Sequence, residues 1–481
     1  MTIKPEKIDP CRWLIPKDGH MRVPGLVFSN EQMMRSIQKD QSLKQVVNVA
    51  TLPGIVGHSL AMPDIHWGYG FPIGGVAAFD PDEGIVSPGG VGYDINCGCR
   101  LMTTRLKANE IRPIIKDIVY ALFKDIPAGV GSTGTLHLSK SKQRDVAVQG
   151  AAWAIKQGYG TALDLEKTED RGVMPDADPS VLSERAIKRG LNQLGTLGSG
   201  NHFLEIQRVD RIYDPEKAAR FNLFEGQATI FIHTGSRGFG HQICDDFLKE
   251  MNKNMASGHQ PFSLPDRQLA CAFLKSELAR RYLAAMACAA NYAWANRQIL
   301  MHRTREILLK ALSTTPDALG MNLLYDVCHN IAKKESHLVD GKPVDLYVHR
   351  KGATRALPPG HPLLPDIYGL TGQPVLIPGD MGTCSYVLAG AEGAMKQSFG
   401  SCSHGAGRAL SRTLAFKKAK GRAIHRELED NGVFVQSRGK RTLKEEMPEA
   451  YKDISQVVSV VHNAGLAHKV ARLKPLGVIK G

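Results

Sequence analysis

The alternation of apolar and polar residues along the chain first indicates short strands. Residues 50–105 are rich in Gly, Pro and β-forming residues, and the segment Gly-Gly-Val-Ala-Ala-Phe at 74–79 predicts a strand bounded by turns. Two later apolar runs, 227–232 and 344–348, predict further strands. Each of these two runs leads directly into a histidine.

The middle of the chain has a helical pattern instead. From Pro265 to about Leu312 it is rich in Ala and Leu with only polar interruptions, which predicts one or two long helices. Residues 409–431 predict another helix, with Lys and Arg on its outer positions. Strands followed by long helices and then more strands favour an α+β fold, with central β-sheets flanked by helices, over a regular βαβ succession.

The residues that could carry chemistry are spread over the whole chain. They lie at 94–97, 201–202, 233, 329 and 404, and no internal repeat or low-complexity linker divides the sequence. A site assembled from such distant segments argues for one integrated domain, which we expect to span residues 1–481.

Charge and cysteine content narrow the class of protein. The 481 residues carry a formal charge of +14, which attracts polyanions such as nucleic acids or nucleotides, although a protein that is merely basic would look the same. Nine scattered cysteines, an odd number, favour a reducing compartment over a disulfide scaffold. No stretch reaches 18 uninterrupted apolar residues and the amino end has no apolar h-region, so we expect a cytoplasmic protein with neither signal peptide nor membrane span.

The glycine-rich segment 89–99, Gly-Gly-Val-Gly-Tyr-Asp-Ile-Asn-Cys-Gly-Cys, contains a candidate metal site. Asp94 and Cys97 stand three residues apart, and a carboxylate and a thiolate are both metal ligands. A thiolate can also bridge two ions. The alternative is a tight turn with an incidental buried cysteine, and Cys99 is best explained as a buried small side chain.

Three further segments place histidines beside small or polar residues. Gly198-Ser-Gly can expose backbone N–H groups to an anion, with Asn201 and His202 at its exit. His233 follows a predicted strand and precedes a loop that carries Arg237, which suits a metal ligand beside a phosphate contact. His329 follows an apolar run. Each histidine taken singly is more often an ordinary hydrogen-bonded residue.

The segment Gly400-Ser-Cys-Ser-His-Gly-Ala-Gly-Arg408 is the strongest candidate for covalent chemistry. Small residues leave His404 sterically open, and the helix predicted just beyond it would bind phosphate at its N-terminus. Arg408 and Arg412 lie one helical turn apart and would face the same direction. Neutral imidazole can attack phosphorus and form a phosphoramidate. An ordinary glycine-rich helix entry is the alternative.

One further segment has a composition that is typical of nucleotide-binding loops, and several common nucleotide-binding and zinc-binding motifs are absent. The turn-rich loop Pro378-Gly-Asp-Met-Gly-Thr-Cys-Ser385 is of a kind that often wraps a nucleotide, although a plain surface turn would have the same composition. The sequence lacks a P-loop, the K-x-D-G pattern of lysine-nucleophile ligases, H-E-x-x-H, and paired C-x-x-C knuckles. These absences exclude the commonest nucleotide-dependent and zinc-dependent classes.

Taken together, five blocks of the chain resemble the RtcB family of RNA ligases, in the family's order and approximate spacing. The blocks are Gly-Tyr-Asp94-Ile-Asn-Cys97-Gly, Gly-Asn201-His202-Phe, His233-Thr-Gly-Ser-Arg237-Gly, Pro-Gly-Asp380-Met-Gly and Ser-His404-Gly-Ala-Gly-Arg408. The resemblance runs over nearly the whole chain. Five matching blocks are far more specific than any one of them.

The resemblance implies a site with two Mn²⁺ ions and a GTP-binding pocket. Manganese is implied by the family alone, because the affinity order for these ligand types would favour zinc. The implied metal ligands, with Cys97 as the bridging one, are Asp94, Cys97, His202, His233 and His329. The implied nucleotide contacts are Asn201, His202, Phe203, Leu204, Glu205, His329, Asn330, Pro378, Gly379, Asp380, Met381, Ser385, His404, Gly405, Ala406, Gly407 and Lys480, with Tyr451 beside the base. The RNA-phosphate contacts that the resemblance implies are Arg189, Arg237 and Arg412.

The function implied is joining of an RNA 3′-phosphate or 2′,3′-cyclic phosphate end to a 5′-hydroxyl end, with His404 taking up GMP. The implied roles are tRNA splicing and RNA repair, with an archease-like protein as a candidate activator. Two other classes compete with this interpretation. A metal-dependent phosphodiesterase would use the same ions without a covalent nucleotide, and an RNA-binding protein would use them structurally.

Overall fold

Two large β-sheets contain most of the strands in the computed structural model, which describes residues 3–257 and 262–481. Residues 1–2 and 258–261 of the predicted domain therefore lie outside the described residues. The first sheet has the strand order β1-β2-β3-β4-β5-β13-β12, and only its β3–β4 pair is parallel. Its strands are β1 (Glu6–Asp9), β2 (Arg12–Ile15), β3 (Gly25–Phe28), β4 (Ile55–His66), β5 (Ile73–Phe79), β12 (Asn330–Val339) and β13 (Lys342–Lys351).

The second sheet has the order β11-β7-β9-β8-β19-β16-β15, and β18 pairs with β19 in parallel. Its strands are β7 (Gly98–Lys107), β8 (Phe203–Ile212), β9 (Gln227–Thr234), β11 (Asn322–Cys328), β15 (Pro374–Ile377), β16 (Ser385–Gly390), β18 (Phe434–Ser437) and β19 (Ala467–Lys480). Two short pairs complete the strands, β6 (Ile85–Val86) with β10 (Ala272–Phe273) and β14 (Ala353–Arg355) with β17 (Ser401–Ser403). The three strands predicted at 74–79, 227–232 and 344–348 are confirmed as β5, β9 and β13.

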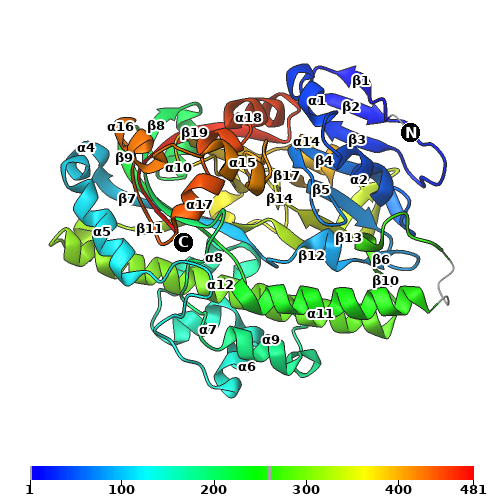
Figure 1. Ribbon diagram of the computed structural model, residues 1–481, viewed down its shortest axis with the longest axis horizontal. Coiled ribbons are helices and arrows are strands. Elements are labelled where there is room, and N and C mark those ends of the chain that lie inside the picture. Colours follow the sequence, from blue (N-terminus) through cyan, green and yellow to red (C-terminus); the bar gives the residue numbers. More distant parts are fainter. Residues whose placement is uncertain (1–2, 258–261) are drawn as a thin grey trace.

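Two long helices, α11 (Arg237–Ala256) and α12 (Glu277–Ala311), run side by side beneath the sheets (Figure 1). The long helix predicted from Pro265 is confirmed as a single helix, but it begins later. Residues 272–273 pair with β6 instead, and the Ser276 hydroxyl then caps α12 by accepting a hydrogen bond from the Ala279 N–H at 3.2 Å. Helix α12 is buried on most of its circumference, which explains its many alanines.

The single helix predicted over 409–431 is wrong. The segment forms two short helices, α15 (Arg412–Lys418) and α16 (Ile424–Asp430), separated by a turn in which Gly421 has a φ of +81°. That left-handed backbone cannot continue a helix and favours glycine. Residues 404–411 precede α15 and form a loop, so the helix N-terminus expected directly after His404 lies farther along the chain, at Arg412.

The remaining helices are short and surround the sheets. Helices α6, α7 and α9 lie on the far side of α11 and α12 from the sheets (Figure 1). The bounds are α1 (Glu31–Ile37), α2 (Ser42–Val49), α3 (Pro88–Val91), α4 (Ala108–Ile111), α5 (Ile115–Asp125), α6 (Lys140–Gln149), α7 (Ala151–Lys156), α8 (Ala162–Glu166), α9 (Glu184–Gly190), α10 (Pro215–Arg220), α13 (Pro316–Leu319), α14 (Glu392–Ser398), α17 (Lys440–Glu445) and α18 (Ile454–Asn463). The predicted α+β class is confirmed. Within the described ranges, every helix is too short or too polar to cross a membrane.

Candidate active site

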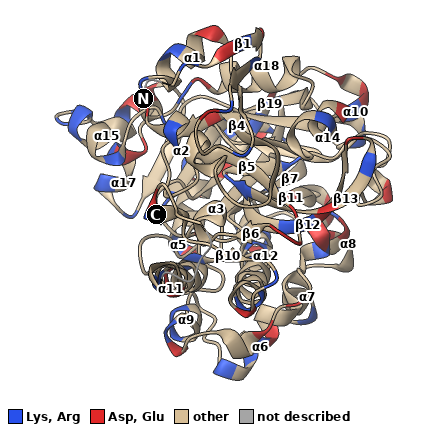
Figure 2. Cartoon of the chain, turned by 90° about the vertical axis from the view of Figure 1, so that its right-hand side faces the viewer, with Lys and Arg blue, Asp and Glu red and all other residues tan. Residues whose placement is uncertain are grey.

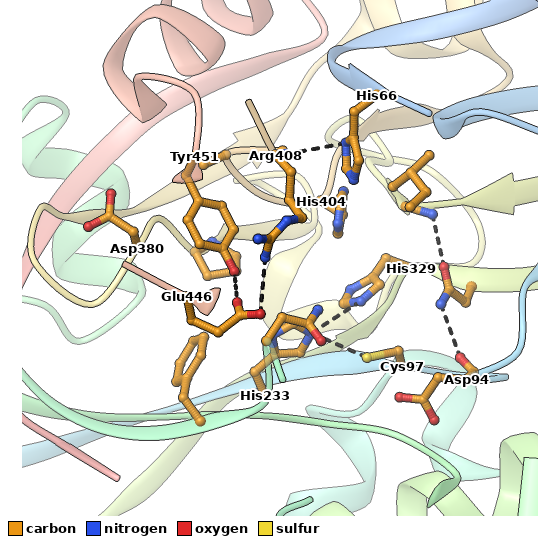
Figure 3. A pocket seen from close by; sticks show the side chains of 18 of the residues that line it. His66, Asp94, Cys97, His233, His329, Asp380, His404, Arg408, Glu446 and Tyr451 are labelled. Atoms are coloured by element: carbon orange, nitrogen blue, oxygen red, sulfur yellow. Dashed lines mark hydrogen bonds and ion pairs between the residues drawn. The ribbon is translucent and has the colours of Figure 1, made fainter. Parts of the chain in front are cut away.

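A cavity of about 390 Å³ takes its lining from both large sheets and gathers most of the predicted site residues. Figure 3 shows His404 between a group of metal-ligand side chains and a cluster formed by Arg408, Glu446 and Tyr451. The predicted residues that line the cavity are Asp94, Cys97, Asn201, Phe203, Glu205, His233, His329, Asn330, Pro378, Gly379, Asp380, Met381, His404, Ala406, Gly407, Arg408, Arg412, Tyr451 and Lys480.

Four of the predicted metal ligands and nucleotide contacts do not line this cavity. Leu204 is buried in a hydrophobic cluster because strand alternation turns it away from Phe203 and Glu205, so only its backbone is near the site. Ser385 is buried, and its hydroxyl accepts a hydrogen bond from the Gly379 N–H at 3.3 Å. Gly405 lies beneath His404, where its N–H donates to Asp64 at 3.3 Å. His202 lies behind Asp94 and Cys97.

The five predicted metal ligands converge. The Cys97 Sγ lies 3.3 Å from Nε2 of both His202 and His233. The His202 Nε2 is also 2.8 Å from the Asp94 Oδ2, and the Nε2 atoms of His233 and His329 are 3.2 Å apart. Two sets of three donors result, Asp94-Cys97-His202 and Cys97-His233-His329, and Cys97 belongs to both.

The protonation of these donors suits divalent cations. Burial lowers the pKa of His233 and His329 well below the usual value, so both rings are neutral and can offer a nitrogen lone pair. Burial, together with the Asp94 charge, raises the pKa of the Cys97 thiol, so a cation would displace a proton there. One carboxylate, one shared sulfur and three imidazoles therefore fit two ions on chemical grounds.

The turn that carries Asp94 and Cys97 is held from below by helix α12. Arg297 donates to the Asn96 carbonyl at 2.8 Å and to the Asn96 side-chain oxygen at 2.9 Å. The same guanidinium pairs with the buried Asp326, at 2.8 and 2.9 Å, and Arg100 pairs with that carboxylate at 2.7 Å. Asn96 has a φ of +50°, so these contacts hold a strained residue directly before Cys97.

His404 is oriented by Asp64, a fully buried residue of β4. The His404 Nδ1 lies 2.7 Å from the Asp64 Oδ2, and the same oxygen accepts the His404 backbone N–H at 3.0 Å. Burial alone would raise the pKa of Asp64, but the His404 ring and the Lys452 ammonium outweigh it and keep that pKa below the usual value. A charged Asp64 accepts a hydrogen bond from the Nδ1–H and leaves the His404 Nε2 unprotonated.

Lys452 holds the backbone around Asp64. Its ammonium donates to the Pro63 carbonyl at 3.2 Å and to the Ile65 carbonyl, one residue before and one after Asp64. Burial lowers the pKa of Lys452 to about 8. His66, which lines the cavity beside His404, directs its Nδ1 at the Asp64 carbonyl at 2.9 Å.

The opposite part of the cavity is organised by Glu446, whose carboxylate is fully buried. It pairs with Arg408 at 3.0 Å, lies 3.7 Å from Arg412 and accepts the Tyr451 hydroxyl. The Arg408 guanidinium also lies 5.2 Å from the centre of the Tyr451 ring. Arg408 precedes α15, so the predicted spacing of one helical turn between it and Arg412 is wrong, although both guanidiniums approach Glu446. The buried Glu446 carboxylate neutralises Arg408, whereas Arg412 is 58% exposed and 3.7 Å from that carboxylate.

Two buried ionisable side chains of the site, those of Glu205 and Lys480, have shifted pKa values. Burial raises the pKa of Glu205 to about 8, and Gln207 donates to its carboxyl at 2.7 Å. Burial lowers the pKa of Lys480, which lines the cavity from β19 and donates to the Gly200 carbonyl at 3.2 Å. Lys480, which the family resemblance implies as a nucleotide contact, thus lies at the cavity together with the end of β19.

The glycines at 198 and 200 make room for cations. A side chain on Gly198 would overlap the Arg237 guanidinium, and one on Gly200 would meet that of Arg412. The Arg237 guanidinium also lies 3.3 Å from the His202 Nδ1. The arginine that is predicted to contact RNA phosphate therefore also contacts a predicted metal ligand. Arg189 lies outside the cavity and donates to Gln242 at 3.1 Å.

Four residues of the site were not predicted from the sequence: Asp64, His66, Arg297 and Glu446. Asp64 and His66 stand in the segment Met62-Pro-Asp-Ile-His-Trp67, at alternate positions of a strand that contains a polar pair in an otherwise apolar run. That pair was the available signal. Arg297 lies within an alanine-rich helix and Glu446 within a charged segment, and neither has a local pattern that separates it from its neighbours.

Comparison with known proteins agrees with this geometry. The family model described as tRNA-splicing ligase RtcB matches residues 45–481. The tRNA-splicing ligase RtcB of Thermococcus kodakarensis is 52% identical over 477 residues, which cover 99% of this chain and 98% of that protein. The RNA-splicing ligase RtcB of Mycobacterium tuberculosis is 53% identical over 440 residues, covering 91% of this chain and 100% of that protein.

These matches define the class of protein: it is an enzyme that ligates RNA. The chain belongs to the RtcB family, and the resemblance described from the sequence is confirmed.

Proposed function

We propose that this protein joins RNA 3′-phosphate or 2′,3′-cyclic phosphate ends to 5′-hydroxyl ends, using GTP and two Mn²⁺ ions. The observation that carries the proposal is the Asp64–His404 pair beside two three-donor sets that share Cys97. The pair activates one imidazole nitrogen toward phosphorus, and the donor sets hold the ions next to it. A ligase with a covalent nucleotide needs both parts.

The two donor sets support one division of the ligands. Asp94 and His202 would hold one ion and His233 and His329 the other, with Cys97 available to both. When bound, the ions neutralise charge on the phosphates and lower the pKa of a coordinated water. Arg297 contributes by keeping the Cys97 turn in place.

His404 carries the nucleotide. Its Nε2 forms a bond to the α-phosphorus of GTP, and the bond from that phosphorus to the pyrophosphate oxygen breaks. Asp64 stabilises the positive charge that develops on the ring through Nδ1. An oxygen of the RNA 3′-phosphate then takes the GMP from Nε2. A 2′,3′-cyclic end is first opened by water. The 5′-hydroxyl finally attacks the RNA phosphorus, loses its proton and displaces GMP.

The guanine and ribose occupy the part of the cavity lined by Glu205, Asp380, Met381, Tyr451 and Lys480. Glu205 and Lys480 are buried hydrogen-bonding groups at its inner wall, and such groups discriminate strongly between bases when left unpaired by the wrong one. The other predicted nucleotide contacts, Asn201, Asn330, Pro378 and Ala406 among them, complete the lining.

The physiological substrates we propose are tRNA halves and other broken RNAs. This is supported by the names of two relatives, one a tRNA-splicing ligase and the other an RNA-splicing ligase. Arg237 and Arg412 hold RNA phosphates, which gives affinity without sequence reading. An archease-like activating protein stays a prediction. A cytoplasmic location is supported by nine free and buried cysteines, which suit a reducing compartment.

The competing function is hydrolysis of cyclic phosphate ends without a nucleotide. That function makes no use of the Asp64–His404 pair or of the buried lining at Glu205 and Lys480. The experiment that separates the two follows labelled RNA ends with Mn²⁺, with and without GTP. A ligase forms a joined strand only with GTP, whereas end consumption that is independent of GTP contradicts the proposal.

A further inference from the structure

A basic surface around an exposed aromatic ring lies next to the mouth of the cavity. Helices α15 and α17 pack against each other there. Phe416 of α15 is 40% exposed, and two cations of α17 flank its ring, the Arg441 guanidinium at 5.5 Å and the Lys444 ammonium at 5.8 Å from the ring centre. Figure 2 shows the blue segments of both helices on one side of the molecule. We call Phe416, Lys417, Lys418, Lys420, Arg441 and Lys444 the α15–α17 surface.

The charges of this surface are available to a ligand. Lys417, Lys418 and Lys420 are exposed, and within the described ranges they form no ion pair with an acidic side chain. Arg441 pairs with Glu445 at 2.6 Å, but that arginine is 78% exposed, so the pair is screened by water and exchanges readily with another anion.

The surface is continuous with the proposed active site. Arg412 lines the cavity and Phe416 follows four residues later on the same helix, so the two side chains project from one face of α15. From Arg412 to Lys418 the helix rises roughly 9 Å, which spans two or three stacked nucleotides of one strand. A strand whose end lies in the cavity can therefore leave it over these residues.

We propose that the α15–α17 surface binds a single-stranded segment of the substrate RNA a few nucleotides away from the reacting end. Phe416 stacks with a base, and the lysines neutralise the phosphates on either side. This inference rests on the function proposed above and adds to it a binding surface outside the cavity. An acidic protein partner could use the same cations, but it would not need a flat aromatic ring beside them.

The test measures RNA binding by fluorescence anisotropy, with a single-stranded RNA of about 20 nucleotides and one of about 4 nucleotides. The variants are Phe416→Ala and the triple Lys417→Gln/Lys418→Gln/Lys420→Gln. The matched control is Lys310→Gln/Lys342→Gln/Lys396→Gln, three exposed lysines that do not line the cavity. No partner protein is added, and labelling by GTP is measured in parallel.

We expect Phe416→Ala to weaken binding of the long RNA about 5-fold or more, as for loss of one stacked base. The lysine triple should reduce the slope of log Kd against log salt by about 2, since each phosphate contact on a single strand contributes about 0.7. The short RNA, the control triple and GTP labelling should be unaffected.

Equal long-RNA affinity and salt dependence for all variants would overturn the inference while leaving the ligase intact. Failure of the proposed function would give a different result, because wild-type protein would then neither be labelled by GTP nor join RNA.

Discussion

The Asp64 Oδ2 and the His404 Nδ1 lie 2.7 Å apart, although the two residues are 340 positions apart in the sequence. The carboxylate belongs to β4 of the first sheet, and the histidine follows β17. Because Asp64 also accepts the backbone N–H of His404, it fixes both the position and the tautomer of the ring. The nucleophilic nitrogen is thereby presented to the cavity before any nucleotide binds.

Asp64→Asn should slow transfer of GMP to His404 by roughly 100-fold, because the neutral amide can no longer stabilise the positively charged ring. The measurement is the single-turnover rate of label incorporation from GTP at saturating Mn²⁺. The amount of bound metal should stay at the wild-type value, since Asp64 is in neither donor set. An unchanged rate would remove Asp64 from the mechanism.

Cys97→Ser should lose most bound metal, because the sulfur belongs to both donor sets. Cys99→Ser provides a matched control, since Cys99 is two residues away, equally buried and part of a hydrophobic cluster. Metal content per chain after dialysis, measured by mass spectrometry, distinguishes the two. If Cys97→Ser retains two ions, the bridging assignment is wrong.

Arg297→Met should lower the free energy of unfolding by about 3–5 kcal/mol, because it leaves the buried Asp326 with only Arg100 and frees the Asn96 turn. Urea denaturation of the metal-free protein measures this. Arg280→Met on the same helix is the control. Its partner Glu277 is exposed, so the free energy of unfolding should stay close to the wild-type value. Similar effects for both variants would contradict the role given to Arg297.

The stability of the protein should depend on pH through Glu205. Burial raises its pKa to about 8 from the usual 4.5 of a glutamate, so the folded state binds more protons than the unfolded state between these values. The stabilisation is fully present below pH 4.5 and is lost as the pH rises through 8, by up to about 1.4 kcal/mol per pH unit.

Glu205→Gln should therefore flatten the dependence of unfolding free energy on pH between about pH 5 and pH 8. Urea denaturation without metal or nucleotide provides the measurement. Glu306→Gln, which alters an exposed residue, should keep the wild-type profile. Parallel profiles for wild type and Glu205→Gln would show that this carboxyl is ionised in the folded protein.

Local patterns predicted the parts of the fold and site that depend on neighbouring residues. The strand at 74–79 and the helix ending near Leu312 follow from periodicity, and the two are found as β5 and α12. The break at Gly421 was missed because the flanking residues all favour a helix and only the backbone angle of that glycine reveals the turn. The metal ligands were expected from the family resemblance, and the structure brings them together.

Pairings over long sequence distances could not be predicted in this way. Asp64 acquires its role only when β4 lies beneath the 404 loop, and Glu446 only when it is buried against Arg408. Arg297 looks like a solvent-facing residue of a helix until the burial of α12 is known. These contacts are set by tertiary packing, and the local trace that they leave is the polar pair Asp64 and His66 in the apolar strand β4.

The central claim is that His404 carries GMP, and labelling with α-phosphate-labelled GTP or ATP in Mn²⁺ tests it most directly. Wild-type protein and His404→Ala are compared on a denaturing gel, with an activating partner supplied. We predict label from GTP alone that is acid-labile and alkali-stable, and that is absent from His404→Ala. Unlabelled wild-type protein, or equal label in the variant, would contradict the ligase mechanism and favour the cyclic-phosphate hydrolase.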